Sequence, residues 1–364
     1  MRGILLFSFF KAKKSKLLVI NQAKSAIEVS DNETILLSAL RHDIAIPNSC
    51  RVGGCASCKC KLIKGQVKEL TESSYVLSAE ELSQGYILAC QSVAKSDVEI
   101  EVDLASISQG YSVISQQGIV KRQWQLTHDI IGIEVELANR LDYVAGQYAN
   151  ISLPTLSSAV RSYSFATQVN TESNLIQFFI KHVEGGELSP KLFDEKLTEL
   201  PIEIEGPYGD FYLRISDKPI ICIAGGSGLA PIKALLEQAK IDKVKRDITI
   251  LFGAKEQRDL YCMDDLSALS GSWLGKFSLI PVLSNEPELS NWQGKRGFVT
   301  EILSEVLIGD EQAYLCGPPV MIDAAITVLK NHSIISSNIF FDKFLSKADL
   351  TKQSTQLSAI EAVG

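Results

Sequence analysis

The sequence has no excess of basic residues, and its N-terminal apolar segment is too short to cross a membrane. Its 36 Lys and Arg residues are outnumbered by 43 Asp and Glu residues, which gives a net charge of −7 at pH 7. A nucleic-acid partner would require a basic surface, so this class of partner is not expected. Residues 4–10 are apolar, but a membrane helix needs about 20 such residues.

The N-terminal segment also lacks the layout of a secretory signal. Most of its positive charge, at Lys11, Lys13, Lys14 and Lys16, follows the apolar residues, whereas a signal peptide carries its charge before them. We therefore expect a terminal extension, with weak membrane contact through residues 4–10 as the minority alternative. Eight cysteines without a secretory context suit a reducing cytoplasm better than a disulfide framework, so the expected location is cytoplasmic.

Four of the eight cysteines form one spacing pattern, C-x4-C-x2-C-x31-C. This spacing matches the plant-type ferredoxin arrangement for a [2Fe–2S] cluster. Gly53 and Gly54 within the loop allow the backbone to fold close to the inorganic sulfides. The predicted metal ligands are Cys50, Cys55, Cys58 and Cys90.

Zinc and disulfides are the alternatives for these cysteines. A zinc site favours two short pairs of cysteines, and Cys90 stands alone in the sequence. Disulfides would need an oxidising compartment. Cys60 adds a C-x-C pair with Cys58, and we predict that it is a strand residue after the loop and not a ligand.

Around the cysteine loop, short alternating segments predict a small β-grasp domain over residues 16–103. Apolar residues alternate in its strands and recur at helical spacing in its one helix, which Asp31 or Asn32 would cap. The expected elements are strands at 17–20 and 26–29, a helix over 32–40, a hairpin with a glycine turn over 61–67, and an edge strand at 98–102.

The rest of the chain divides into a linker, a barrel and an α/β domain. Residues 104–117 contain no charged side chain, which is typical of an interdomain linker. Over 118–215, short strands separated by Gly and Pro favour an antiparallel barrel. Over 216–346, continuous apolar runs such as 219–224 alternate with an amphipathic helical pattern, as in a parallel α/β sheet. Residues 347–364 are expected to form a mobile tail.

The barrel carries the segment Arg-Ser-Tyr-Ser at residues 161–164. Arg161 could form a bidentate ion pair with a pyrophosphate. Tyr163 could lie against a flavin ring, and Ser164 could hydrogen-bond its redox-active edge. The segment alone would fit a strand with one buried tyrosine equally well, and its position in a barrel favours the flavin interpretation.

A second segment, Lys-His-Val-Glu-Gly-Gly-Glu-Leu-Ser at residues 181–189, strengthens this interpretation. Gly185 and Gly186 precede a helix that we expect to start near Leu188. Backbone amides at a helix start can bind a pyrophosphate, and Ser189 could add a hydroxyl donor.

A glycine-rich turn follows the first buried strand of the α/β domain. Ala-Gly-Gly-Ser-Gly-Leu-Ala-Pro at residues 224–231 would bring a dinucleotide pyrophosphate close to the start of a helix. The pattern is G-G-x-G and not G-x-G-x-x-G, so it does not indicate an ordinary Rossmann dehydrogenase. A tight strand–helix turn without a ligand is the alternative.

Two further segments lie where strands of a parallel sheet end. Cys316 follows the strand at 312–315, and a thiol at that end would point into the ligand cleft. Asp342-Lys343-Phe344 ends the last strand, where an aromatic ring could cover a flavin face. Core packing is the alternative for both Cys316 and Phe344.

Together and in this order, the motifs of residues 17–346 resemble the ferredoxin–NAD(P)H reductase components of bacterial multicomponent oxygenases. The resemblance implies a multidomain chain: a β-grasp [2Fe–2S] ferredoxin domain, an antiparallel β-barrel flavin domain and an α/β parallel-sheet NAD(P)H domain. It implies catalytic roles for Ser164, Cys316, Asp342 and Phe344. The expected cofactor-binding residues are Arg161, Ser162, Tyr163, Ser164, Lys181, Val183, Gly185, Gly186, Ser189, Gly225, Gly226, Ser227, Gly228, Pro231, Cys316, Gly317 and Phe344.

The resemblance also implies an electron relay from NAD(P)H through FAD to the [2Fe–2S] cluster, and from there to a terminal oxygenase or its ferredoxin. The oxygenase could be a ring-hydroxylating dioxygenase or a diiron monooxygenase. Two alternatives stay open: the same relay serving a deoxysugar dehydratase or a desaturase, and a simple ferredoxin-type carrier with a degenerate reductase half. We expect a monomer.

NADH is favoured over NADPH. Glu256 and Asp259, after the strand at 248–252, would repel a 2′-phosphate, although Lys255 and Arg258 could bind one. The chain departs from the family pattern at Glu184, where relatives often carry Pro, which leaves the path of the Gly185-Gly186 turn open. It also departs at its tail, which runs past the usual family end.

Overall fold

The structure is a computed structural model that describes residues 16–23, 25–42, 44, 46–48, 53, 58–77, 79–102, 111, 113–156, 159–169, 172–194 and 196–344. Cys50 and Cys55, the apolar residues 4–10 and the tail 347–364 lie outside the described residues. By their internal contacts, residues 1–104 without 48–50 form one compact unit, and the remaining residues form a larger one. Within the described ranges, no helix combines the length and apolar character needed to span a bilayer.

The smaller unit is a β-grasp domain, as predicted. Its main sheet has the strand order β2-β1-β7-β3-β5, and α1 packs its buried side chains Ile35, Leu36 and Ala39 into the core. The elements are β1 (Lys16–Ile20), β2 (Ile27–Val29), α1 (Ile35–Arg41), β3 (Lys59–Lys64), β4 (Val67–Glu69), α2 (Ala79–Ser83), β5 (Tyr86–Leu88), β6 (Ser92–Ala94) and β7 (Val98–Glu101).

Two strand predictions in this domain are wrong. Strand β7 lies between β1 and β3 and not at the sheet edge, because its alternation reports one buried face and says nothing about the number of neighbouring strands. Strands β3 and β4 are not paired as a hairpin. The neighbours of β3 are β5 and β7, so no edge of β3 is left for β4, which pairs with β6 in a separate two-stranded sheet.

The cap of α1 also differs from the prediction. Thr34 is the N-cap, and its side chain accepts a hydrogen bond from the backbone N–H of Leu37 over 3.3 Å. Asn32, one of the two expected caps, instead adopts a positive φ of 62° in the turn before the helix. Thr and Asn are both good N-caps, so composition alone could not choose between them.

The larger unit begins with a six-stranded antiparallel barrel of order β11-β10-β13-β8-β9-β12. An isolated bridge between Phe165 and Phe178 brings the two end strands together, so the barrel is nearly closed. Strand β8 starts inside the stretch predicted as linker. The elements are β8 (Ile114–Gln125), β9 (Ile130–Leu137), β10 (Tyr148–Ser152), β11 (Arg161–Ser164), β12 (Leu175–Lys181), α3 (Ser189–Asp194) and β13 (Pro201–Tyr208).

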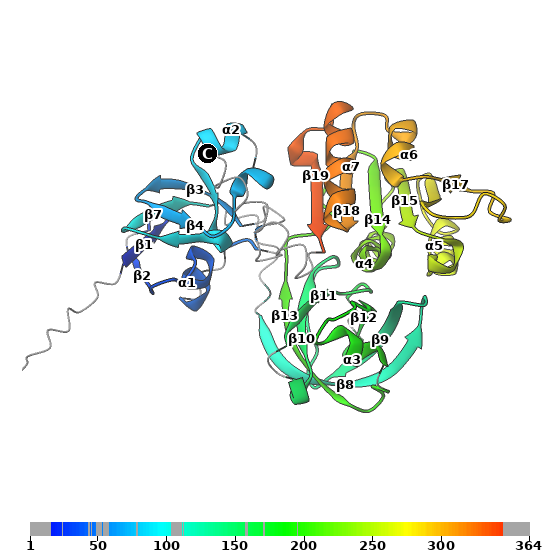
Figure 1. Ribbon diagram of the computed structural model, residues 1–364, viewed down its shortest axis with the longest axis horizontal. Coiled ribbons are helices and arrows are strands. Elements are labelled where there is room, and N and C mark those ends of the chain that lie inside the picture. The colour runs from blue at the N-terminus through cyan, green and yellow to red at the C-terminus, as the bar shows by residue number, and fades with distance from the viewer. Residues whose placement is uncertain are drawn as a thin grey trace, which may run out of the picture. The chain divides into compact units, whose positions relative to one another are not determined.

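The second part of the larger unit is the predicted parallel α/β domain (Figure 1). Its sheet has the order β17-β16-β15-β14-β18-β19, and its neighbouring strands are all parallel over the described residues. The elements are β14 (Ile220–Gly225), α4 (Leu229–Ile241), β15 (Ile248–Ala254), α5 (Met263–Ser270), β16 (Phe277–Leu283), β17 (Lys295–Arg296), α6 (Val299–Val306), β18 (Gln312–Gly317), α7 (Pro319–Asn331) and β19 (Ile339–Lys343).

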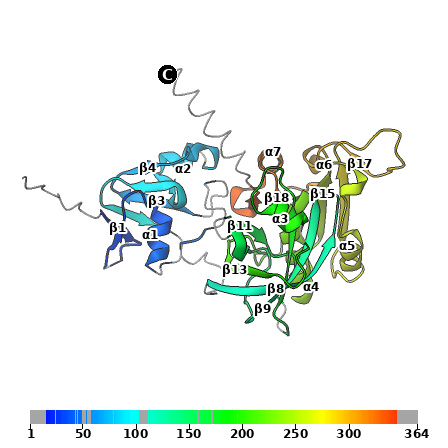
Figure 2. The same ribbon diagram turned by 60° about the horizontal axis from the view of Figure 1, so that its bottom comes forward.

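Side chains of β14 point alternately into two hydrophobic cores, one on each face of the sheet. Cys222 and Ala224 face α4 and α5, whereas Ile221 and Ile223 face α6 and α7. Residues that pack against α4 include Phe179 and Ala166 of the barrel, and α4 lies beside the barrel strands in both views (Figure 2). The barrel and the α/β sheet therefore share one hydrophobic core. This core holds the barrel and helix α4 against each other.

Candidate functional site

Cys58 and Cys90, two of the four predicted cluster ligands, are neighbours beside the paired strands β3 and β5. The backbone N–H of Cys90 donates to Sγ of Cys58 over 3.4 Å, and the N–H of Ala89 donates to the Cys58 carbonyl over 3.0 Å. Nε2 of Gln91 lies 3.7 Å from Sγ of Cys90. Both thiols are buried. Hydrogen bonds to sulfur are among the features that set the potential of an iron–sulfur cluster, so these residues fit one.

The cysteine loop passes close to the Cys90 segment. Gly53 has a φ of +81°, and a Cβ there would lie 2.7 Å from Cγ of Gln91 and 3.0 Å from Oγ1 of Thr71. A larger residue would be excluded by both its φ and its neighbours. Cys60 lies in β3 and is 1% exposed, as predicted for a strand residue, and burial together with Cys90 raises the pKa of its thiol to about 12.

Strand β11 carries the predicted flavin contacts and pairs antiparallel with β10. The guanidinium of Arg161 forms an ion pair with the Glu187 carboxylate over 3.0 Å. The side chain of Arg161 is 34% exposed. Strand alternation places Arg161 and Tyr163 on one face and Ser164, which is buried, on the other. Arg161 and Tyr163 can therefore meet one ligand, and the hydrogen bond predicted from Ser164 stays a prediction.

The turn after β12 has an open backbone. Gly185 has a φ of +69°, and no atom lies within 4 Å of the position of a Cβ there. The hydroxyl of Ser189 accepts a hydrogen bond from the N–H of Val183 over 3.1 Å, and the N–H of Gly186 donates to the Val183 carbonyl over 2.9 Å. Ser189 thus fixes the turn and starts α3, one residue after the predicted Leu188, while its hydroxyl proton can still be donated to an acceptor.

The glycine-rich turn joins β14 to α4, and its backbone packs directly on the end of β18. A Cβ on Gly228 would lie 2.2 Å from the carbonyl oxygen of Cys316. Gly226 has a φ of +55°, and its carbonyl accepts a hydrogen bond from the hydroxyl of Tyr261 over 2.9 Å. The nearest atom to a Cβ on Gly226 is Nζ of Lys181, at 3.8 Å. This turn leaves room for the close approach of a dinucleotide and so fits one.

Cys316 is enclosed by three parallel strands. It pairs in register with Ala224 of β14 and Asp342 of β19, and none of its surface is exposed. Burial, with a smaller contribution from Asp342, raises the pKa of its thiol well above the usual value. The neighbouring Gly317 carbonyl accepts a hydrogen bond from the N–H of Phe344 over 2.9 Å. The predicted roles of Cys316 and Phe344 at the nicotinamide stay predictions.

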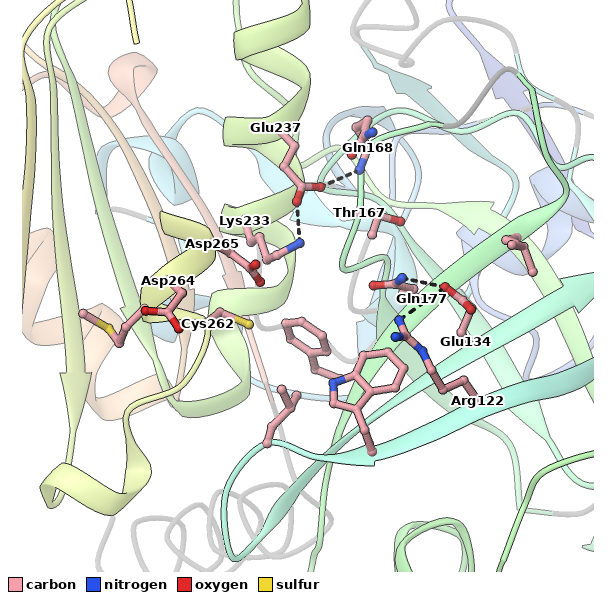
Figure 3. Close-up of a pocket in the computed structure, with 15 residues that line it drawn as sticks. Arg122, Glu134, Thr167, Gln168, Gln177, Lys233, Glu237, Cys262, Asp264 and Asp265 are labelled. Carbon is pink, nitrogen blue, oxygen red and sulfur yellow. Dashed lines mark hydrogen bonds and ion pairs between the residues drawn. The ribbon is translucent and has the colours of Figure 1, made fainter. Parts of the chain in front are cut away.

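Three side chains near these turns were missed by sequence reasoning. Tyr261 holds the glycine turn, and Lys233 forms an ion pair with Glu237 on α4. The pair borders a cavity of about 600 Å³ between the barrel and helices α4 and α5 (Figure 3). None of these three side chains belongs to a sequence motif. The i,i+4 spacing of Lys233 and Glu237 usually marks a solvated helix face, so no pattern in the sequence indicates their burial.

Three family models match consecutive parts of the chain. The 2Fe-2S iron-sulfur cluster binding domain covers residues 18–95, the oxidoreductase FAD-binding domain covers 117–212, and the oxidoreductase NAD-binding domain covers 222–327. The xylene/toluene monooxygenase electron transfer component XylA of Pseudomonas putida is 42% identical over 321 residues, which is 88% of this chain and 91% of that protein. The chain belongs to the reductase components of multicomponent oxygenases.

Other relatives of this reductase family agree over nearly the whole length. The reductase component DmpP of phenol 2-monooxygenase from Pseudomonas sp. strain CF600 is 31% identical over 350 residues, covering 94% of this chain and 98% of that protein. The crystal structure of the Amycolatopsis cytochrome P450 reductase GcoB superimposes with a TM-score of 0.74 at 28% identity, covering 91% and 99%. The chain is thus an NAD(P)H-dependent oxidoreductase with [2Fe–2S], FAD and NAD as cofactors.

Proposed function

We propose that the chain delivers electrons from NADH to a terminal monooxygenase that acts on aromatic hydrocarbons. The observation that carries this is the 42% identity to the xylene/toluene monooxygenase electron transfer component, because the match runs through all three domains. When bound, FAD supplies the conversion between a two-electron hydride and single electrons, which no side chain provides. The chain matches the FAD-binding and NAD-binding domains as well as the 2Fe-2S domain, which counts against a simple ferredoxin-type carrier with a degenerate reductase half.

The residues of the chain would bind and orient the cofactors. Arg161 and Ser189 would hold the flavin phosphates, the ring of Tyr163 would face the flavin, and Gly225–Gly228 would admit the nucleotide pyrophosphate. Support comes from the exposed guanidinium of Arg161 and from the open backbone at Gly185. We also propose domains at 16–103, 118–215 and 216–346, and a monomeric state.

A captured partner tests the choice of acceptor. Affinity capture with the tagged full chain, followed by reconstitution of the captured oxygenase with the chain, NADH and toluene, is expected to yield hydroxylated toluene. The contradicting result is capture of a desaturase or a dehydratase that the chain reduces at the expense of NADH. The chain alone, without the captured protein, is the control for uncoupled oxidation of NADH.

The turn after β15 supports NADH as the electron donor. The backbone N–H of Glu256 donates to the Asp259 carboxylate over 3.0 Å, which holds both acids in one turn. The guanidinium of Arg258 is paired with Glu256 over 3.0 Å, so its charge is partly neutralised. A carboxylate in this position suits a ribose 2′-hydroxyl and repels a 2′-phosphate.

We therefore expect kcat/KM for NADH to exceed that for NADPH by about tenfold or more, equivalent to about 1.4 kcal/mol. Steady-state reduction of ferricyanide with each coenzyme measures the ratio. Glu256→Gln should lower the ratio of kcat/KM for NADH to that for NADPH. The substitution removes a charge that repels the 2′-phosphate, and it frees Arg258 from its ion pair. Equal values of kcat/KM in the parent protein would refute the preference for NADH.

A further inference from the structure

Helix α4 carries a buried ion pair that no cofactor motif explains. Lys233 is 5% exposed, and its ammonium group contacts the carboxylate of Glu237 one turn further along. Lysine is almost never buried to this degree without a partner. A pair at this spacing ordinarily lies on the solvated face of a helix, whereas this one lies on the face that packs against the barrel.

Both side chains also bond to the backbone of the barrel. Nζ of Lys233 donates to the Ala166 carbonyl over 3.4 Å. The N–H of Gln168 donates to the Glu237 carboxylate over 3.2 Å (Figure 3). Residues 166–168 continue directly from β11, the strand that carries the proposed flavin contacts. The ion pair therefore links α4 to the chain segment next to the flavin strand.

The barrel fixes the same segment from its other side. The hydroxyl of Tyr143 donates to the Gln168 carbonyl over 3.0 Å, and its ring stacks on Phe165 with centroids 3.8 Å apart. Next to the segment, the barrel and helices α4 and α5 are separated by the cavity of about 600 Å³, which Trp124 and Met263 help to line. Side chains do not fill this part of the interface. The bonds from Lys233 and Glu237 to the backbone of residues 166–168 therefore align helix α4 with the barrel.

Helix α4 begins directly after the Gly225–Gly228 turn, so any shift of α4 moves that turn. We propose that Lys233 and Glu237 are positioning residues that hold the nucleotide-binding turn in register with the flavin strand. The inference rests on the proposed function of both sites. Buried ion pairs contribute little net stability, and one documented use is to fix a single arrangement. A misplacement of about 1 Å can slow a reaction about a hundredfold.

The test compares Lys233→Met, Glu237→Ala and Glu237→Gln with Asp242→Asn. Asp242 ends the same helix, and its carboxylate accepts a hydrogen bond from Gln238 at an exposed site, which makes it the matched control. Two quantities are measured on the full chain. They are the rate constant for flavin bleaching after rapid mixing with saturating NADH, and the amide hydrogen exchange of Gln168.

We expect Lys233→Met and Glu237→Ala to slow bleaching by about ten- to a hundredfold at unchanged flavin content. Exchange at Gln168 should accelerate in Glu237→Ala. Glu237→Gln keeps an oxygen acceptor for that amide, so it should protect Gln168 yet still slow bleaching. The control should match the parent protein in both measurements.

Bleaching at the parent rate in Lys233→Met and in both Glu237 variants would overturn the inference, even if exchange at Gln168 changed. Unchanged exchange at Gln168 in Glu237→Ala would overturn it as well, because the bridge would then be absent. A parent protein whose flavin NADH does not bleach would overturn the proposed function first and this inference with it. Circular dichroism of each variant separates these results from unfolding.

Discussion

At the scale of single residues, Gly228 lies too close to the backbone of a neighbouring strand to accept a Cβ atom. A Cβ there would lie 2.2 Å from the Cys316 carbonyl oxygen, so β18 and the glycine turn would have to separate. Gly228→Ala should lower the free energy of unfolding by about 1–3 kcal/mol and raise the KM for NADH. Urea unfolding and steady-state kinetics measure these effects.

Gly271→Ala is the control for this substitution. Gly271 has a φ of −63°, and the nearest atom to its Cβ position is 3.8 Å away, so alanine fits without strain. If both variants had the parent stability and KM, the close packing of the glycine turn on β18 would not matter for nucleotide binding.

Sequence patterns located the glycine turn but could not locate its supports. The turn follows from local order, since Gly225, Gly226 and Gly228 lie between a buried strand and a helix. The hydroxyl of Tyr261, which is distant in the sequence, bonds to the turn. The Lys233–Glu237 pair bonds the following helix to the barrel and has the spacing of an ordinary surface pair. Their roles depend on which residues the fold brings together, and no spacing in the sequence records that.

At the scale of elements, α1 of the ferredoxin domain is held by a carboxylate with an unusually low pKa. Arg41 donates from Nε and Nη2 to Glu33 over 3.0 and 2.9 Å, and the Ser30 N–H and the Ser38 hydroxyl donate to the same carboxylate. These bonds, opposed in part by burial, lower the pKa of Glu33 from 4.5 to about 2.

Because the folded pKa is below the unfolded one, Glu33 stabilises α1 above about pH 4.5, and this contribution is lost as the pH falls towards about 2. Glu33→Gln should cost about 1–2 kcal/mol at pH 7, allowing for solvent screening of the ion pair, and much less at pH 3. Amide exchange of α1 in the full chain measures this. Glu101→Gln at the exposed end of β7 is the control, and a pH-independent cost would contradict the account.

The elements themselves could be predicted better than their pairing. The alternation at 98–102 and the turn at Gly65 correctly indicated strands, yet β7 is central and β4 pairs with β6. Alternation reports which face of a strand is buried. Which strands lie on its two sides depends on contacts between distant segments, such as the parallel pairing of β1 with β7.

At the scale of the whole molecule, the three domain types could be predicted because each leaves a local signature. Cysteine spacing, strands with the Arg161–Ser164 segment, and continuous apolar runs each point to one domain. The core shared by the barrel and the α/β sheet has no such signature, since it joins Phe179 to Leu235 across two domains. That shared core places the glycine turn and the flavin strand in one compact unit.

In the proposed relay, electrons leave the chain through the [2Fe–2S] cluster. The most direct test compares NADH-dependent reduction of ferricyanide and of cytochrome c by the parent chain and by Cys55→Ser. The variant is expected to keep ferricyanide reduction, which the flavin half supports. Its rate of cytochrome c reduction should fall at least about tenfold, equivalent to a rise of about 1.4 kcal/mol in activation free energy. Cytochrome c reduction at the parent rate in a variant shown to lack the cluster would contradict the proposed relay.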